Sequence, residues 1–300
     1  MHHPLRLSLL RIFTICFGMF STIFLVQGVG PVLNAKASLP DNGIIIVQFD
    51  DTYKSTFTKA YPILQARNWK AQAYVSPYVV GWNYKMSLSD LTTLSQAGWD
   101  ISSHGWTHVD ATTLDPVQLV QHLKDSHDWL VNNGFVQGAR HYGPPLAIIN
   151  QTVYDEAIKY YMTIRVVPTG QYKQWLLMPA GYTYNMIAAH DAQTWNFVKG
   201  YIDRVTNNSQ VLFLTYHDIV DANPISNQTS VAFFTQAMDY IAQKGINVMT
   251  MSEFVDGSYN DPTPTDTEMP TETLTPTPTD TETPTETLTP TPTDTETPTE

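Results

Sequence analysis

Cysteine is almost absent from this 300-residue chain, and so are other features that would mark particular classes of protein. The single cysteine, Cys16, lies in an N-terminal apolar run, so the rest of the chain offers neither a disulfide nor a thiolate metal ligand. The 16 Lys and Arg residues are outnumbered by 28 Asp and Glu, which gives no basic surface for a nucleic-acid partner. No glycine-rich phosphate turn follows any predicted strand.

The N-terminal 37 residues have the layout of a secretory signal peptide. Arg6 and Arg11 precede an apolar run over residues 12–26, and Ala35-Lys36-Ala37 supplies a small-x-small cleavage site. The run is short for a membrane span, so an uncleaved anchor is the less favoured alternative. We therefore expect a secreted protein, extracellular or held at the cell surface.

Residues 262–300 form a low-complexity tail of Thr, Pro, Asp and Glu. A fourteen-residue repeat begins again at Pro262, Pro276 and Pro290, and the tail has no Lys or Arg. A segment with so few apolar residues cannot bury a core, so we expect a disordered C-terminal stalk.

Residues 38–261 remain as a single domain, expected to be monomeric, in which predicted strands and helices alternate. This alternation predicts an α/β fold with parallel strands and helices outside. The absence of a phosphate turn favours a barrel over an open sheet, and seven strands predict a distorted, incomplete parallel β/α barrel. The strands are expected at 44–49, 71–75, 99–102, 140–142, 162–167, 211–216 and 246–249. Helices are expected at 54–67, 87–97, 116–134, 150 onward, 191–205 and 230–244, with an irregular region around Trp175, Tyr182 and Tyr184.

Two adjacent carboxylates follow the first predicted strand. The run Ile44–Phe49 is apolar apart from Gln48, as in a strand buried on both faces, and Asp50 and Asp51 come directly after it. Ligands bind at the carboxyl ends of parallel strands, and unpaired carboxylates there are costly unless a cation or a reaction uses them. The alternative is that Asp51 caps the next helix.

Histidines follow two further strands. His104 and His108 are four residues apart in SSHGWTH, a spacing at which two imidazoles can share a metal ion, and His217 ends the run VLFLTYH. Each motif alone has an ordinary structural explanation, as a surface, capping or core histidine. Their occurrence together, each after a strand, favours a functional site.

The motifs FDD, HGWTH and LTYHDI, in this order, resemble those of the polysaccharide deacetylases, carbohydrate esterase family four. The resemblance covers about residues 43–255. It implies that Asp51, His104 and His108 bind a divalent metal, zinc first and cobalt, nickel or manganese as alternatives. It also implies that Asp50 is the general base.

The rest of the family pattern is matched unevenly. The resemblance makes His217 the general acid and Leu214 a groove residue. The third family motif carries an arginine that orients the base, and this chain has Gly143 at that position, with Arg140 and Arg165 as candidate replacements. Leu146 replaces a tyrosine whose backbone N–H helps to hold the oxyanion.

The resemblance implies a metal-dependent hydrolase that removes acetyl groups from an acetylated glycan of a cell envelope or extracellular polysaccharide. Trp82, Tyr84 and Trp106 could stack on sugar rings, and partial core packing is the equal alternative. Chitin, peptidoglycan, poly-N-acetylglucosamine and acetylated xylan, with N- or O-acetyl groups, all remain open as substrates. A carbohydrate-binding pseudoenzyme on a cell-surface stalk is the second hypothesis, supported by Gly143. A purely structural surface protein is the third.

Overall fold

The computed structural model describes residues 40–165, 184–208 and 210–257. The predicted signal peptide, the predicted stalk, Trp175 and Tyr182 lie outside these ranges. Within them, no helix is long and apolar enough to span a membrane.

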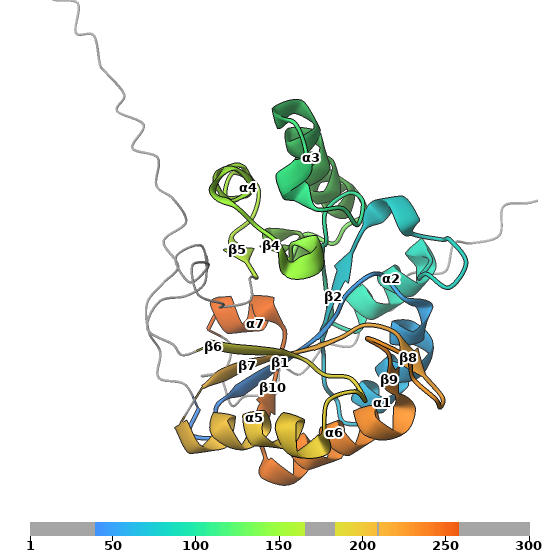
Figure 1. Cartoon of the computed structure of the whole chain (residues 1–300), viewed down its shortest axis with the longest axis vertical. Helices are drawn as coiled ribbons and strands as arrows, with labels where there is room; N and C mark the ends of the chain where they lie inside the picture. Colours follow the sequence, from blue (N-terminus) through green and yellow to red (C-terminus); the bar gives the residue numbers. More distant parts are fainter. Residues whose placement is uncertain (1–39, 166–183, 209, 258–300) are drawn as a thin grey trace, which may run out of the picture. The chain divides into compact units, whose positions relative to one another are not determined.

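A curled parallel sheet forms the centre of the domain (Figure 1). Its strand order is β5-β4-β3-β2-β1-β7-β6, and every pair along this path is parallel. In the described part of the chain β5 and β6 do not pair with each other, so the sheet does not close. The predicted seven-stranded, incomplete β/α barrel is therefore confirmed. The strands are β1 (Ile44–Phe49), β2 (Gln72–Val75), β3 (Asp100–Ser103), β4 (His141–Tyr142), β5 (Thr163–Ile164), β6 (Tyr184–Ala188) and β7 (Val211–Tyr216).

Three short strands complete the β-structure. The strand β10 (Asn247–Val248) pairs with the first half of β1, through Ile44 and Ile45. The strands β8 (Ile219–Val220) and β9 (Thr229–Ser230) pair with each other, beyond the end of β7.

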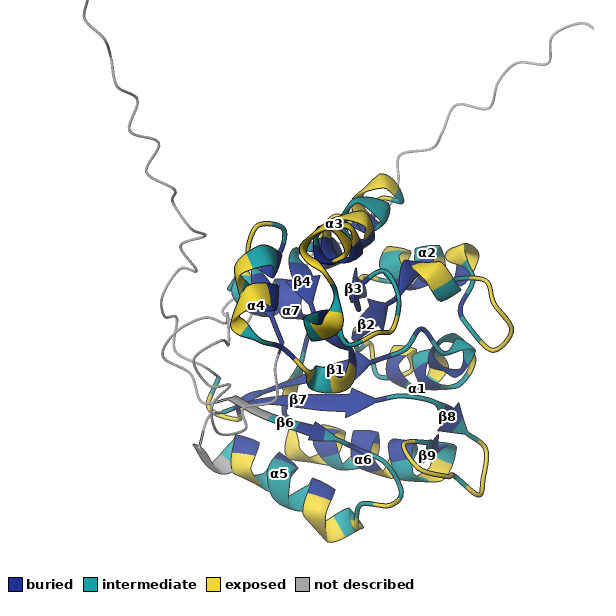
Figure 2. Cartoon of the chain, turned by 45° about the horizontal axis from the view of Figure 1, so that its top comes forward, coloured by how far each residue is buried: buried dark blue, intermediate teal, exposed yellow. Residues whose placement is uncertain are grey.

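Helices pack around the sheet, with their buried sides toward the strands (Figure 2). Local sequence signals set their ends. Asp115 caps α3 by accepting hydrogen bonds from the backbone N–H groups of Val117 and Gln118, ahead of Pro116 at the first helical position. Asn150 caps α4 in the same way. The helices are α1 (Tyr61–Gln65), α2 (Leu88–Gln96), α3 (Pro116–Asn132), α4 (Gln151–Ala157), α5 (Trp195–Asn208), α6 (Val231–Lys244) and α7 (Met251–Val255).

The structure departs from the predicted elements in two places. A regular strand, β6, starts at Tyr184, where an irregular region was expected. The helix expected from residue 54 contains a π-helical turn over Thr56–Ala60. Its preceding residue, Ser55, does not cap it, because the Ser55 hydroxyl donates to Asp218 Oδ1 (2.7 Å) and accepts from the Ile219 backbone N–H (2.9 Å).

The interior of the barrel changes character along β1. Ile44 and Ile46 belong to an inner apolar cluster with residues of β7 and α7. Gln48, on the same face two residues on, is fully buried and hydrogen-bonds to Gln72 Oε1 at 2.8 Å. Asp50 continues this face past the end of the strand. The apolar core thus ends below a polar layer, and the polar layer supports the site above it.

Buried His141 makes the free energy of unfolding depend on pH. Burial lowers its pKa to about 3 from the ordinary 6.5, so the folded chain keeps it neutral while the unfolded chain protonates it. The stability that this histidine contributes is present above pH 6.5 and is lost as pH falls. We expect wild type to lose about 1.4 kcal/mol more per pH unit than His141→Gln between pH 6.5 and 4. Denaturant unfolding of chelator-treated protein at several pH values checks this, and parallel slopes for the two proteins would contradict it.

Candidate active site

The two carboxylates after β1 separate because the chain turns between them. The Asp50 backbone N–H still donates to Tyr216 O (2.9 Å), as if the strand continued. Asp51 and Thr52 then adopt φ values of 67° and 62°, in the left-handed region that a threonine rarely enters. A regular strand would have pointed Asp51 to the opposite face from Asp50. The turn brings both carboxylates to one pocket.

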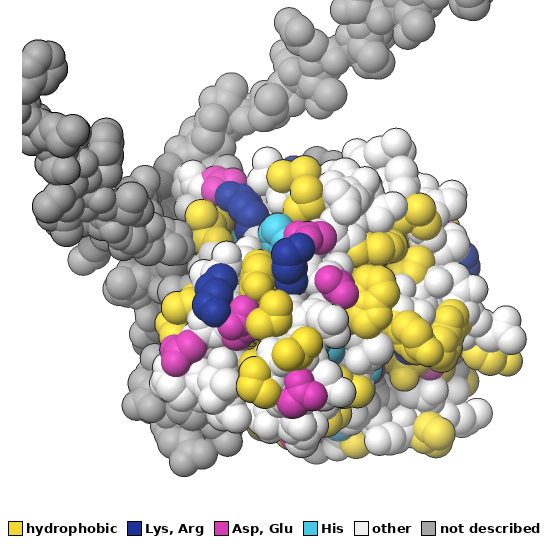
Figure 3. All heavy atoms as spheres, turned by 90° about the horizontal axis from the view of Figure 1, so that it is seen from above, with side chains coloured by type: hydrophobic (Ala, Val, Ile, Leu, Met, Phe, Trp, Pro, Cys, Tyr) yellow, Lys and Arg dark blue, Asp and Glu magenta, His cyan; other side chains and the backbone are white. Residues whose placement is uncertain are grey.

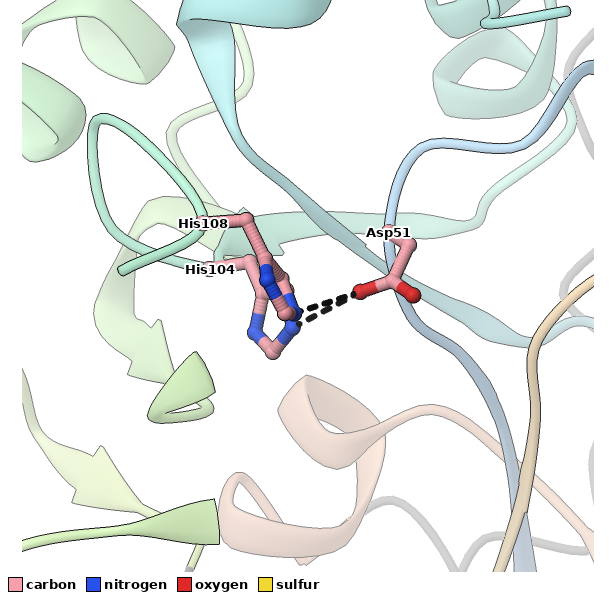
Figure 4. A group of neighbouring side chains, drawn as sticks. All are labelled: Asp51, His104 and His108. Carbon is pink, nitrogen blue, oxygen red and sulfur yellow. Dashed lines mark ion pairs between the residues drawn. The ribbon is translucent and has the colours of Figure 1, made fainter. Parts of the chain in front are cut away.

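Asp51 faces the two predicted histidine ligands (Figure 4). Its Oδ1 lies 3.3 Å from His104 Nε2 and 3.0 Å from His108 Nε2. All three ligand atoms lie within 4.8 Å of one another. His104 is fully buried and comes from the end of β3, while His108 is exposed in the loop that follows.

The chemistry of this ligand set fits a divalent cation. His104 Nδ1 lies 2.6 Å from Gly143 O, so the ring nitrogen that donates is fixed and the Nε2 lone pair is left to face Asp51. Asp51 Oδ1 is buried and has no hydrogen-bond donor among the described residues. Two imidazoles and one carboxylate are ordinary ligands of zinc, with an open position for water.

Asp50 pairs with Arg165 and is not part of the three-residue ligand set. Arg165 Nη1 lies 2.9 Å from Asp50 Oδ1 and Nη2 lies 2.7 Å from Oδ2, a bidentate pair in which both residues are buried. Burial alone would raise the pKa of Asp50, but the Arg165 charge outweighs it and holds the pKa below its ordinary value. Asp50 is therefore ionised at neutral pH, in the form that can accept a proton.

The sequence left Arg140 and Arg165 as candidates for this role, and the structure distinguishes them. Arg140 pairs with Asp256 at 3.0 and 2.9 Å and does not reach the pocket. Arg165 also donates to Gln48 Oε1 (3.1 Å) and lies 4.3 Å from the Tyr74 ring centroid. Its guanidinium is thus held on several sides.

Gly143 leaves the space that Arg165 uses. A Cβ on Gly143 would come within 2.9 Å of the Tyr74 ring and 3.1 Å of Arg165 Nη2. A side chain at this position and the guanidinium from β5 therefore compete for the same place. Where the family pattern has an arginine, this chain has Gly143, and Arg165 pairs with Asp50 instead.

The pocket above these residues has a volume of about 500 Å³. It brings together the carboxylate pair, the histidine pair, His217 and Leu146, as the sequence predicts. Leu146 is 58% exposed and has a left-handed φ of 58°, which turns the backbone at the rim.

Leu214 is not part of the pocket, contrary to the expectation of a groove residue. Its side chain is 0% exposed and lies in the main core cluster on the outer face of β7. Successive strand residues point to opposite faces, so Thr215 lines the pocket in its place. Met186 and Ala188 of β6 also line it, and these were missed because β6 was not predicted.

The predicted aromatic residues lie outside the pocket. Trp82 is 54% exposed and Tyr84 85% exposed, both in the connection between β2 and α2, while Trp106 is partly buried. Figure 3 shows exposed hydrophobic side chains gathered on the right of the view, the side on which Figure 1 draws α2. Trp82, Tyr84 and Trp106 therefore do not line the pocket.

The fold and the position of this pocket place the chain among barrel proteins whose sites lie at the carboxyl ends of the strands. Within that class, residues 38–164 of the chain match the polysaccharide deacetylase family model. The family consists of hydrolases that act on carbon–nitrogen or ester bonds of carbohydrates. The matched range holds β1 to β5, the carboxylate pair and the histidine pair.

The chain is also similar to a curated protein and to solved structures. YxkH of Bacillus subtilis, named for the same family, is 26% identical over 131 residues, which are 43% of this chain and 47% of that protein. The chain therefore aligns with about half the length of that relative. The peptidoglycan deacetylase PdaC of Bacillus subtilis has a similar fold, with a TM-score of 0.50 and 16% identity over 74% of this chain and 96% of PdaC. The Xyl-CE4 domain of a xylanase from the hindgut metagenome of Trinervitermes trinervoides has a TM-score of 0.49 and 17% identity, over 72% of this chain and 91% of that domain.

Proposed function

We propose that this chain is a secreted, metal-dependent deacetylase that hydrolyses N-acetyl or O-acetyl groups of an extracellular or cell-envelope polysaccharide. The observation that carries the proposal is the convergence of one acid–base carboxylate and one three-residue ligand set in a single pocket. Asp50 is ionised and held by Arg165, and Asp51, His104 and His108 face one another beside it. We further propose that it acts as a monomer.

A bound divalent metal, zinc first, would supply an activated water and polarise the acetyl carbonyl. The residues of the chain then divide the proton transfers. Asp50 takes a proton from the attacking water, and His217, in the same pocket, gives a proton to the leaving amine or alcohol. The backbone N–H of Leu146, on the pocket rim, donates to the developing oxyanion in this proposal. The products are acetate and a free amino or hydroxyl group on the sugar.

Acetate release tests the activity directly. Purified protein should release acetate from at least one of acetylated chito-oligosaccharides, peptidoglycan, poly-N-acetylglucosamine and acetylated xylan. Binding of these glycans without release from any of them would favour the pseudoenzyme alternative.

The metal site predicts a second measurable result. Removing both histidine ligands, in His104→Ala/His108→Ala, should lower zinc content from about one ion per chain to nearly none and abolish acetate release, since a single carboxylate cannot hold the ion. Elemental analysis after dialysis reports the metal content. His127→Ala is the matched control, because His127 lies on α3 and pairs with Asp128 outside the ligand set. Full zinc occupancy in the double variant would contradict the assignment.

A further inference from the structure

The turn that carries Asp51 is fastened to the connection between β2 and α2, residues Ser76–Met86, here called the aromatic loop. Tyr78, Trp82 and Tyr84 in this loop are exposed. The loop contacts the turn through main-chain hydrogen bonds: Met86 N donates to Thr52 O, and Lys54 N donates to Tyr84 O, both at 2.8 Å.

The turn itself is in a conformation that needs support. Asp51 and Thr52 are consecutive non-glycine residues with left-handed φ values. Such residues cost about 1–2 kcal/mol each, and they persist only where the surroundings hold them. Thr52 is held by its buried hydroxyl, which accepts from the Ser76 backbone N–H at 3.1 Å. The peptide of Asp51 has a separate support, a hydrogen bond from a side chain to its carbonyl oxygen.

That support is one lysine side chain. Lys85 Nζ donates to the backbone oxygen of Asp51 at 2.8 Å. The same ammonium lies 3.7 Å from the centroid of the Tyr53 ring, and Tyr53 and Lys85 also form an antiparallel bridge. Lys85 therefore spans the turn, with its ammonium both on the carbonyl of Asp51 and over the neighbouring Tyr53 ring.

Two effects of Lys85 on a metal at Asp51 have opposite signs. As a cation near the ligand carboxylate, Lys85 repels a second cation, so charge alone predicts that its removal would tighten metal binding. As a clamp on the Asp51 carbonyl, it fixes the carboxylate relative to His104 and His108, and its removal would weaken metal binding. Groups that orient a ligand typically change metal affinity by about 10- to 100-fold. A solvent-screened repulsion is worth less than this.

We propose that Lys85 is a positioning residue for the metal ligand Asp51, and that through it the aromatic loop forms part of the support of the metal site. The inference rests on the proposed metal-dependent function. It goes beyond that function by assigning a role to a residue outside the ligand set and outside the pocket lining.

Zinc affinity of the chelator-treated protein tests the proposal. Lys85→Met, which keeps the stem and removes both the donor and the charge, should bind Zn²⁺ about 10- to 100-fold more weakly than wild type. Lys85→Arg keeps a charged donor and should recover most of the affinity. Competition against a chromophoric chelator gives the dissociation constants without any activity measurement.

Lys54→Met is the matched control. It removes a neighbouring cation in the same turn, but Lys54 Nζ pairs with Asp90 (2.5 Å) and not with Asp51. Its zinc affinity should stay within about threefold of wild type, since only a screened charge is lost. The melting temperature of each metal-free variant shows whether an effect on zinc is more than a loss of folding.

The outcomes separate the inference from the function on which it rests. Unchanged or tighter zinc binding by Lys85→Met would overturn the positioning role, as would equal weakening in Lys54→Met. A wild-type protein that binds no Zn²⁺ would overturn the proposed function, and the inference with it. Weakening confined to Lys85→Met and reversed in Lys85→Arg is the expected result.

Discussion

Asp50→Asn should keep its zinc and lose most of its activity. The amide is nearly isosteric with the carboxylate and the three ligands are untouched, but it cannot accept the proton of the attacking water. Loss of a positioned general base lowers the rate by about 10²- to 10⁴-fold. Metal content and acetate release on the same preparation report both properties.

Asp51→Ala should show the other pattern and lose both metal and activity, because it removes the charged member of the ligand set. The two variants together test the division of labour between adjacent carboxylates. A metal-free Asp50→Asn beside a zinc-loaded Asp51→Ala would show that the roles are reversed. Full activity in both variants would mean that the pair has only a structural purpose.

Arg165→Met should produce the second large effect, on stability as well as on rate. It leaves the buried Asp50 carboxylate without its bidentate partner, and breaking a buried pair in this way costs about 3–5 kcal/mol of stability. The rate should fall at least about tenfold, because the base loses its fixed orientation. Denaturant unfolding and acetate release measured below the unfolding transition separate the two losses.

A double-mutant cycle shows whether the two residues act as a pair. Asp50→Asn/Arg165→Met removes both charges together, so its stability should exceed the value expected from adding the two single losses. Its activity should remain as low as that of Asp50→Asn. Additive stabilities would contradict the pairing. Arg140→Met is the control, because Arg140 pairs with Asp256 away from the pocket.

Local patterns were sufficient to predict most of the fold. The apolar run of β1, broken only by Gln48, and the caps of α3 and α4 depend on residues close in sequence, and the structure has them in place. The strand β6 was missed because its aromatic and polar residues, from Tyr184, show neither alternation nor a continuous apolar run.

Site residues that directly follow a strand could be predicted from the sequence. Pairs between residues far apart in the sequence were harder to predict. Asp50 and His104 each follow a buried strand, so topology alone brings them together. The pairing of Asp50 with Arg165 joins residues 115 positions apart, and the sequence could name Arg165 only as one of two candidates. The prediction that Leu214 lines the groove was wrong by one residue. Successive residues of β7 face the core and the pocket in turn, so Leu214 faces the core and Thr215 the pocket.

The shared space between Gly143 and Arg165 has an evolutionary consequence. An arginine at position 143 and one at position 165 cannot both approach Asp50, because even a Cβ at 143 already touches the Arg165 guanidinium and the Tyr74 ring. Starting from this chain, Gly143→Arg alone would crowd the base, and loss of Arg165 alone would leave the base unpaired. Either substitution alone would disturb the surroundings of Asp50, so we expect positions 143 and 165 to change together.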